Sequence, residues 1–398
     1  MASYEAVKVS ESVYWVGAID WGVRDFHGYL TQRGTTYNAY LVIGSEPVLV
    51  DTVKGPFFSE MMGRIASVMD PADIKHVISN HSEMDHSGNL AHVLCAIKPE
   101  TVYASKLGKK NLQEHFGIGE RITEVADGES LDLGANKFTF AETRMLHWPD
   151  SMITYFHNDG MLFSQDGFGM HLASYERFAD EIEKPILDYE AAKYYANILT
   201  PLAPIVTKSI ETLLSLNLDL KVIAPDHGPI WRENITEIVQ KYQTWARRET
   251  VNKAVVTFDT MWGSTEQMAK AISEGLHEAG LRVKTMPLKG CHRSDIATEL
   301  LDARLLVVGS PTINNQIYPT VADLMTYVAG LKPADLFASS FGSFGWSGEA
   351  VGKLKEMVEA MKATFAGEGL KVKFVPDEQT LEECRKYGKD LAAELSDN

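Results

Sequence analysis

The second half of the chain alternates between short apolar runs and amphipathic segments so regularly that few folds remain open to it. Apolar runs at 253–259, 282–288, 304–312, 336–346 and 371–376 predict five strands. Between and after them, segments such as 265–280 and 381–395 carry helical periodicity. Strands that alternate with helices form parallel, doubly wound sheets, and such sheets bind ligands at the carboxyl ends of their strands. We therefore predict a five-stranded parallel α/β domain over 251–398.

The first half has a different pattern of predicted secondary structure. It contains many short β-rich segments broken by turn residues, with helical periodicity at a few places such as 57–69 and 88–97. A polar amphipathic segment at 233–250 separates the short β-rich segments from the alternating strands and helices of the second half. We place the domain boundary there, which divides the chain into 1–250 and 251–398.

Composition narrows the range of partners and compartments. The net charge of −16 argues against nucleic acid as a partner, because phosphate binding needs a basic face. The three cysteines form no C-x-x-C pair, which excludes a cysteine-rich zinc, rubredoxin-type or iron–sulfur site in this chain and favours a reducing compartment. The sequence shows neither a signal peptide nor an apolar run long enough for a membrane helix. We expect a cytoplasmic protein that does not bind membranes.

Residues 79–90, SNHSEMDHSGNL, concentrate metal-ligand types directly after a short apolar run. His81, Glu83 and Asp85 alternate, and His86 follows at once. Alternate residues of an extended strand end point to the same side, and a turn then redirects the later ones, so these four side chains could serve two metals rather than one. Further candidates, each just after a strand-like run, are His147, Asp166 and His227.

This order of residues resembles the metallo-β-lactamase superfamily, whose usual signature is H-x-H-x-D-H followed by later His, Asp and His. Here Glu83 stands where that signature has its second histidine. A carboxylate in place of an imidazole makes the site harder and more anionic. Zinc would accept four histidines and three carboxylates, but the balance suits iron.

Three loops of the second half predict a flavin site. The first, 258–272, places hydroxyls and backbone amides at a helix N-terminus, which is a site for an anion, and lacks the P-loop lysine. It resembles the phosphate loop of flavodoxins, and the loops at 310–316 and 342–350 fit the same pattern. Trp262 and Trp346 are candidates for stacking on the flavin ring. The predicted FMN-binding residues are Thr260, Met261, Trp262, Gly263, Ser264, Thr265, Pro311, Thr312, Ile313, Asn314, Ser343, Phe344, Gly345 and Trp346.

A metallo-β-lactamase-like αββα sandwich followed by a flavodoxin-like domain resembles the flavodiiron proteins, or A-type flavoproteins, in their minimal two-domain class. The resemblance covers essentially the whole chain. It implies FMN, two non-haem iron ions with a bridging oxygen species, and reduction of O2 to water or of NO to N2O. By this resemblance one iron would be held by His81, Glu83, His147 and Asp166, and the other by Asp85, His86, His227 and a bridging Asp166.

Partners and pocket residues follow from the same resemblance. We expect a head-to-tail homodimer, or a dimer of such dimers, in which the flavin of one chain meets the metals of the other. Electrons would arrive from a rubredoxin-like or other small redox protein, because the chain has no iron–sulfur motif and no G-x-G-x-x-G motif. Candidate proton donors near the metals are His27, His171 and Tyr195.

Two other functions compete with this interpretation. The first is a dinuclear zinc hydrolase fused to a flavodoxin-like electron-transfer module, which Glu83 disfavours. The second is an electron carrier whose first domain is a docking scaffold, which the complete set of seven ligand types disfavours. The sequence does not choose between O2 and NO.

Overall fold

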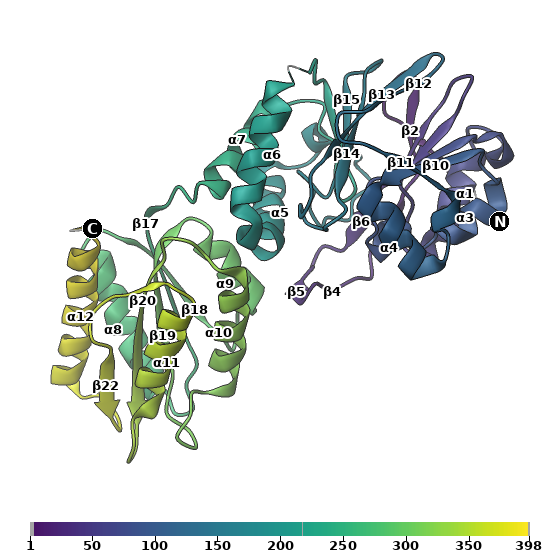
Figure 1. Cartoon of the computed structure of the whole chain (residues 1–398). Helices are drawn as coiled ribbons and strands as arrows, with labels where there is room; N and C mark the ends of the chain where they lie inside the picture. The colour runs from purple at the N-terminus through teal and green to yellow at the C-terminus, as the bar shows by residue number, and fades with distance from the viewer. Residues whose placement is uncertain (1–3, 217, 397–398) are drawn as a thin grey trace. The chain divides into compact units, whose positions relative to one another are not determined.

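The computed structural model describes residues 4–216 and 218–396, which form two compact units (Figure 1). The first unit runs through Tyr194 and resumes over Pro204–Gln243, and the second consists of Tyr195–Ala203 and the chain from Thr244 onward. The short segment Tyr195–Ala203 thus belongs to the second unit. The single boundary predicted at residue 250 assigns this segment to the first domain. Every helix in the described part of the chain is too short or too polar to cross a bilayer.

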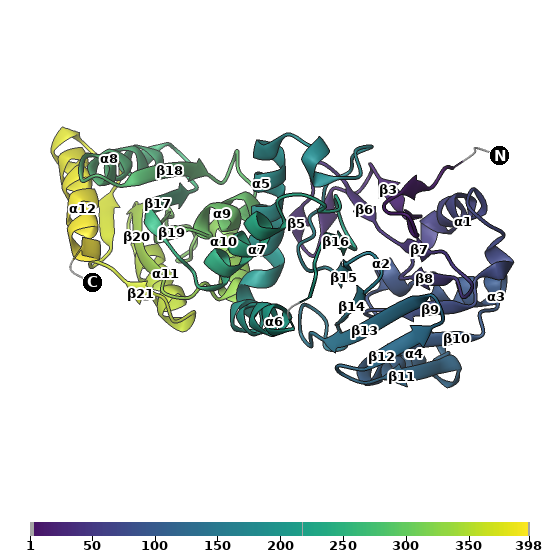
Figure 2. The same cartoon turned by 90° about the horizontal axis from the view of Figure 1, so that it is seen from above.

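The first unit contains two stacked sheets (Figure 2). The seven-stranded sheet has the order β1 (Val7–Lys8), β2 (Val13–Trp15), β7 (Tyr40–Val42), β8 (Val48–Val50), β9 (His76–Ser79), β10 (Thr101–Ser105) and β11 (Ile122–Val125). The five-stranded sheet has the order β12 (Ser130–Leu133), β13 (Asn136–Glu142), β14 (Met152–Phe156), β15 (Met161–Gln165) and β16 (Val222–Pro225). Two small ribbons pair β3 (Ala18–Asp20) with β6 (Thr35–Tyr37) and β4 (Asp25–Phe26) with β5 (Tyr29–Leu30).

Side-chain alternation along β8 shows how the layers form. Leu49 points to the helices α1 (Phe58–Ala66), α3 (Leu90–Ile97) and α4 (Lys106–Phe116), whose apolar residues share its cluster. Val48 and Val50 point the other way and join Phe138, Phe156 and Phe163 of the second sheet. The far face of that sheet is covered in part by α6 (Ala203–Ser215), and the unit also contains α5 (Lys184–Tyr194) and most of α7 (Ile235–Ala246). The predicted αββα sandwich is therefore confirmed.

The second unit is a parallel sheet with helices on both faces, as predicted. Its strands are β18 (Arg282–Pro287), β17 (Val251–Phe258), β19 (Ala303–Gly309) and β20 (Phe337–Phe344), followed by β21 (Thr364–Phe365) and β22 (Leu370–Lys373). Both β21 and β22 pair with β20, one with each half. β22 corresponds to the strand expected at 371–376, and β21 is an additional short strand that the sequence analysis did not predict. Helices α8 (Ser264–Glu278) and α12 (Glu378–Ser396) cover one face, and α9 (Arg293–Leu300), α10 (Pro319–Leu331) and α11 (Glu349–Ala360) cover the other (Figure 1).

Glycines at the crossing of α8 and α12 let the two helices approach closely. A Cβ atom on Gly275 would lie 1.9 Å from the carbonyl oxygen of Arg385, and one on Gly388 would lie 2.3 Å from that of Ile272. Real Cβ atoms do not approach this closely, so each helix needs a glycine where it meets the other. This contact holds the first helix after the predicted phosphate loop against the sheet.

Candidate functional site

The turn after β9 carries four of the seven predicted metal ligands and is held in place by hydrogen bonds from neighbouring strands. The carboxylate of Asp51, at the end of β8, accepts hydrogen bonds from the backbone N–H of Asn80 at 2.7 Å and from its side-chain amide at 2.6 Å. Thr154 on β14 donates to the Asn80 side-chain oxygen at 2.7 Å. The turn leads into the short helix α2 (Met84–Ser87), and the Ser87 hydroxyl donates to the carbonyl of Ser82 at 2.7 Å. Both sheets therefore fix the ligand turn.

One half of the predicted site brings together residues from three separate turns. The Nε2 atom of His147 lies 3.1 Å from Glu83 Oε2 and 3.2 Å from Asp166 Oδ2. The Nε2 atom of His81 lies 3.4 Å from the same Asp166 oxygen. Two imidazole nitrogens and two carboxylates thus converge on one point.

The other half contains the remaining three residues. The Nε2 atom of His227 lies 3.1 Å from Asp85 Oδ2 and 3.3 Å from the Nε2 atom of His86. It also lies 3.6 Å from Oδ1 of Asp166, the oxygen that the first half does not contact. Asp166 therefore presents one oxygen to each half, and the His86 ring points into the same space as its neighbours.

Buried polar atoms that lack hydrogen-bond partners support a metal centre at this point. Both nitrogens of His81 and both oxygens of Asp85 and Asp166 are buried and have no hydrogen-bond partner among the described residues. Buried polar groups are normally hydrogen-bonded, and removing a charged carboxylate from water costs on the order of several kcal/mol. Metal ions would satisfy all of these atoms at once, so the donor set fits two bound metals of the kind that accept imidazole and carboxylate.

The charges of these residues depend strongly on one another. Burial acts to raise the pKa of Asp166, but the imidazoles of His81 and His147 lower it well below its ordinary value. Burial likewise acts against a charged His147, yet the carboxylates of Asp166 and Glu83 raise its pKa to about 10. Without metal, the site therefore holds protons on histidine nitrogens that a metal ion would have to displace.

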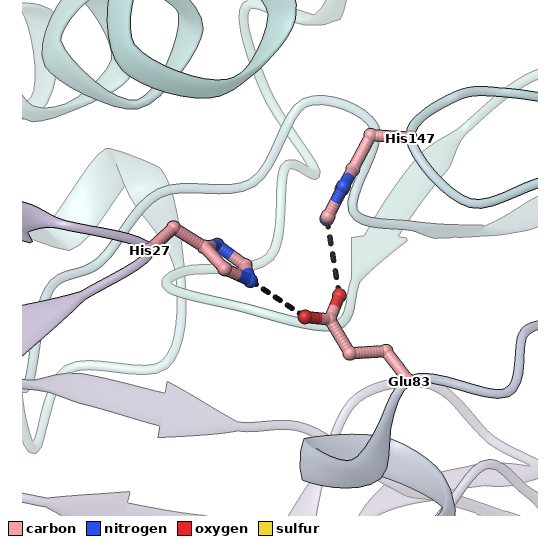
Figure 3. A group of neighbouring side chains, drawn as sticks. All are labelled: His27, Glu83 and His147. Atoms are coloured by element: carbon pink, nitrogen blue, oxygen red, sulfur yellow. Dashed lines mark hydrogen bonds and ion pairs between the residues drawn. The ribbon is translucent and has the colours of Figure 1, made fainter. Parts of the chain in front are cut away.

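The site is most open where His27 lies over it. The side chains of Glu83 and His147 are 12% and 13% exposed, whereas those of the other five predicted ligands are at most 3% exposed. His27 lies in the turn between β4 and β5 and is one-third exposed. Its Nε2 atom lies 2.6 Å from Glu83 Oε1, while the other Glu83 oxygen faces His147 (Figure 3). His27 thus stands between solvent and the predicted ligands.

In the second unit, the predicted flavin loops line one open groove with about 1110 Å³ of empty space. Gly263, in a left-handed conformation with φ 88°, precedes α8, and its N–H donates to the Thr260 hydroxyl at 3.0 Å. The hydroxyl of Thr265 is 2.9 Å from that of Ser343, which joins the first loop to the third. Gly263 and Thr265 support the groove without lining it, and the other predicted residues line it together with Phe374 and Val375, which the sequence analysis missed.

Comparisons with known proteins identify both domains of the chain. A model described as the ODP family of β-lactamases matches residues 35–228, and the flavodoxin model matches residues 256–388. The chain is 43% identical over 395 residues to a rubredoxin-oxygen oxidoreductase from Megalodesulfovibrio gigas, covering 98% of both chains. It is 40% identical over 397 residues to a nitric oxide reductase from Moorella thermoacetica, covering 99% of this chain and all of that one. The crystal structure of the flavodiiron protein from Giardia intestinalis superposes with a TM-score of 0.93 and 33% identity, covering 98% of this chain and 96% of the other.

This chain belongs to the flavodiiron proteins. The family predicted from the sequence is therefore confirmed, and so is its fold, a lactamase-like domain followed by a flavodoxin domain. Membership also favours a flavodiiron oxidoreductase over the competing zinc hydrolase.

The structure separates the three predicted proton donors of this flavodiiron protein. The Nδ1 atom of His171 is 2.7 Å from the Thr35 hydroxyl, and its ring lies 4.6 Å from that of His227. Burial, followed by the charge of His227, lowers the pKa of His171 well below its ordinary value, so the ring is neutral. His27 and His171 thus both lie beside predicted ligands.

Tyr195 lies elsewhere. It belongs to the second unit, where its ring packs 5.2 Å from that of Trp245. Its neighbour Tyr194, at the end of α5 in the first unit, lies 5.2 Å from the His171 ring and 6.3 Å from that of His227. Tyr194, and not the predicted Tyr195, is therefore the tyrosine that lies beside His171 and His227. Successive helical residues point about 100° apart, and nothing in the sequence distinguishes the two adjacent tyrosines.

Sequence analysis missed three residues that support the two sites. Asp51 and Asp226 are buried carboxylates beside the ligand histidine His81. The ammonium of Lys289 donates to the carbonyl of Thr260 at 2.8 Å and so brings a positive charge to the predicted phosphate loop from outside it. Asp51 and Asp226 each follow a strand-like run as the ligands do, and Asp226 directly precedes His227, which is the signal that could have identified them.

Proposed function

We propose that the protein reduces dioxygen, nitric oxide or both at two iron ions in its first unit, with electrons delivered through FMN in its second unit. The observation that carries the proposal is the position of Asp166, whose two oxygens face two separate groups of imidazoles and carboxylates. This arrangement is what a bridged pair of metals requires. The names of two full-length relatives, nitric oxide reductase and rubredoxin-oxygen oxidoreductase, support both substrates.

Each cofactor has its own set of residues. His81, Glu83 and His147 would hold one iron, Asp85, His86 and His227 the other, and Asp166 would bridge them. The hydroxyls of the first flavin loop and the amides at the start of α8 would hold the FMN phosphate. When bound, the reduced flavin and two ferrous ions supply four electrons, enough to reduce O2 to two waters, and two of these electrons suffice to convert two NO into N2O and water.

The chain's own residues would supply protons and exclude bulk water. His27 is placed to deliver protons at the open side, because it is partly exposed and contacts Glu83. On the buried side, His171 is packed against the rings of Phe26, Tyr29 and Tyr194. These rings make that side of the centre apolar, which suits a diatomic gas.

Assembly and electron supply complete the proposal. Trp262 and Trp346, at the flavin groove, are 88% and 91% exposed. Aromatic side chains this exposed favour coverage by another chain, and we propose a head-to-tail homodimer or a dimer of such dimers. A rubredoxin-like donor is supported by the name of one relative, and a cytoplasmic location is supported by cysteines that form no disulfide among the described residues.

The test measures the metal and flavin content of the purified protein, followed by anaerobic reduction and stopped-flow mixing with O2 and, separately, with NO. We expect two irons and one FMN per chain and reoxidation by at least one gas, and the ratio of the two rates identifies the preferred substrate. Two zinc ions, with FMN that neither gas reoxidises faster than free flavin, would overturn the proposal in favour of a hydrolase.

A further inference from the structure

One carboxylate oxygen lies behind two of the ligand histidines. Oδ2 of Asp226 is 3.5 Å from Nδ1 of His81 and 3.8 Å from Nδ1 of His86. Both rings turn their other nitrogen, Nε2, toward the predicted metals. This oxygen and both Nδ1 atoms are buried and have no hydrogen-bond partner among the described residues. The three atoms therefore face one another.

Asp51, the other carboxylate near His81, does not compete for this role. Both of its oxygens accept hydrogen bonds from Asn80, at 2.7 and 2.6 Å. Among the described residues, the ion pairs of the His81 ring run to Asp166 and Asp226 and none runs to Asp51. Asp226 is also the carboxylate that pairs with Nδ1 of His86.

The backbone fixes Asp226 where the two halves of the site meet. Its N–H donates to the carbonyl of Gln165 at 2.8 Å, and its carbonyl accepts from the N–H of Asn38 at 2.7 Å. Gln165 directly precedes the bridging Asp166, and Asp226 directly precedes the ligand His227. A displacement of the Asp226 carboxylate would therefore affect both predicted metal positions that Asp166 bridges.

We propose that Asp226 is a positioning residue shared by the two metal positions, whose single oxygen Oδ2 accepts the Nδ1–H of both His81 and His86. A carboxylate oxygen has two lone pairs and can accept two donors. Acceptance at Nδ1 fixes each ring in the tautomer that presents a free Nε2 and makes that nitrogen a better metal ligand. The inference rests on the proposed di-metal function, because His81 and His86 belong to different metal positions in it.

The experiment is a zinc titration of metal-free protein, wild type and Asp226→Asn, with FMN bound. At nearly unchanged shape, an amide replaces one of the two acceptor oxygens with an NH2 group, which cannot accept a ring N–H. We expect both zinc sites to weaken by about 10- to 100-fold together, the usual effect of losing a partner of a metal-bound histidine. The matched control is Asp150→Asn. Asp150 is equally buried, its carboxylate has no hydrogen-bond partner among the described residues, and it forms no ion pair with a ligand histidine there. We expect its zinc affinities to match wild type.

A second measurement needs no variant and serves if Asp226→Asn fails to fold. Nitrogen-15 and proton NMR of histidine-labelled, zinc-substituted wild-type protein reports, from the shift of each Nδ1–H proton, whether that proton is hydrogen-bonded. We expect the downfield shift of a hydrogen-bonded Nδ1–H for both His81 and His86. The proposal is overturned if either Nδ1–H has the shift of a proton without an acceptor, or if Asp226→Asn weakens one zinc site and spares the other. Wild-type protein that binds fewer than two zinc ions would instead contradict the proposed function.

Discussion

The Nε2 atom of His27 lies 2.6 Å from Oε1 of Glu83, so a partly exposed histidine contacts a predicted metal ligand directly. This contact predicts that His27→Gln lowers the rate at which O2 or NO reoxidises the reduced protein by about 100-fold, a typical loss for one proton-transfer group. Metal and FMN contents should stay at wild-type values, because Glu83 keeps His147 as a neighbour. Stopped-flow reoxidation measures the rate.

The control for His27 is His157→Gln, which removes an exposed histidine that contacts Thr139 on the second sheet. Its reoxidation rate should equal that of the wild type. A His27→Gln rate within twofold of wild type would mean that His27 holds Glu83 in place and moves no proton.

Asp166 and Glu83 should differ in how many metals they hold. Asp166 faces both halves of the site, whereas Glu83 contacts His147 and His27 on one side. We therefore expect Asp166→Asn to reduce metal content from two ions per chain to less than one, and Glu83→Gln to reduce it to about one. Elemental analysis of purified, reconstituted protein measures both. Asp180→Asn, which removes a surface partner of Arg232, is the control and should retain two. Equal losses in the two site variants would contradict the division into halves.

The metal ligands were predictable because their chemistry is visible in the sequence. Seven residues of ligand type follow short apolar runs in the first half of the chain, and a sheet brings its strand ends to one edge. The structure places all seven candidates, from His81 to His227, in one cluster. The flavin loops were visible for the same reason, since they follow β17, β19 and β20, which are neighbours in the parallel sheet.

Other features depend on packing that the sequence does not display. Asp226 faces the Nδ1 atoms of His81 and His86, on the side of each ring away from the metals. The fold brings these residues together, and their order in the sequence does not show this. The choice of Tyr194 over Tyr195 depends on the direction in which a helix turns at its end, where the α-helix gives way to the π-helical segment Tyr195–Leu199. That segment joins the second unit through contacts with residues about a hundred positions away, as for Asn197 and Ser294.

Trp346 should contribute to flavin binding and little to stability. It is 91% exposed and lines the groove, so a bound flavin ring would gain a stacking surface from it. We expect Trp346→Ala to weaken FMN binding by about fivefold, the equivalent of about 1 kcal/mol of aromatic contact. Unfolding of the flavin-free protein should be unchanged, as for most exposed substitutions. Fluorescence titration of flavin-free protein measures the affinity, and Tyr175→Ala, an exposed aromatic of the first unit, should bind FMN like wild type.

Asn197 should stabilise the flavodoxin unit, although it lies in the first half of the sequence. Its side-chain oxygen accepts a hydrogen bond from the Tyr327 hydroxyl at 2.7 Å, and its amide donates to the Ser294 carbonyl at 3.2 Å and to the Thr298 hydroxyl at 3.4 Å. Asn197→Ala removes all three of these hydrogen bonds, so we expect a loss of about 1–3 kcal/mol in the unfolding free energy of this unit. Release of FMN during urea unfolding reports that transition.

The matched control is Asn252→Ala, which removes an exposed amide with one hydrogen bond, to the carbonyl of Gly280. It should shift the transition by less than about 0.5 kcal/mol, as surface substitutions do. Metal release in the same experiment should be unchanged in Asn197→Ala, because the metal ligands belong to the other unit. A shift in metal release with none in FMN release would show that Asn197 supports the first unit, which contradicts the assignment of Tyr195–Ala203 to the second.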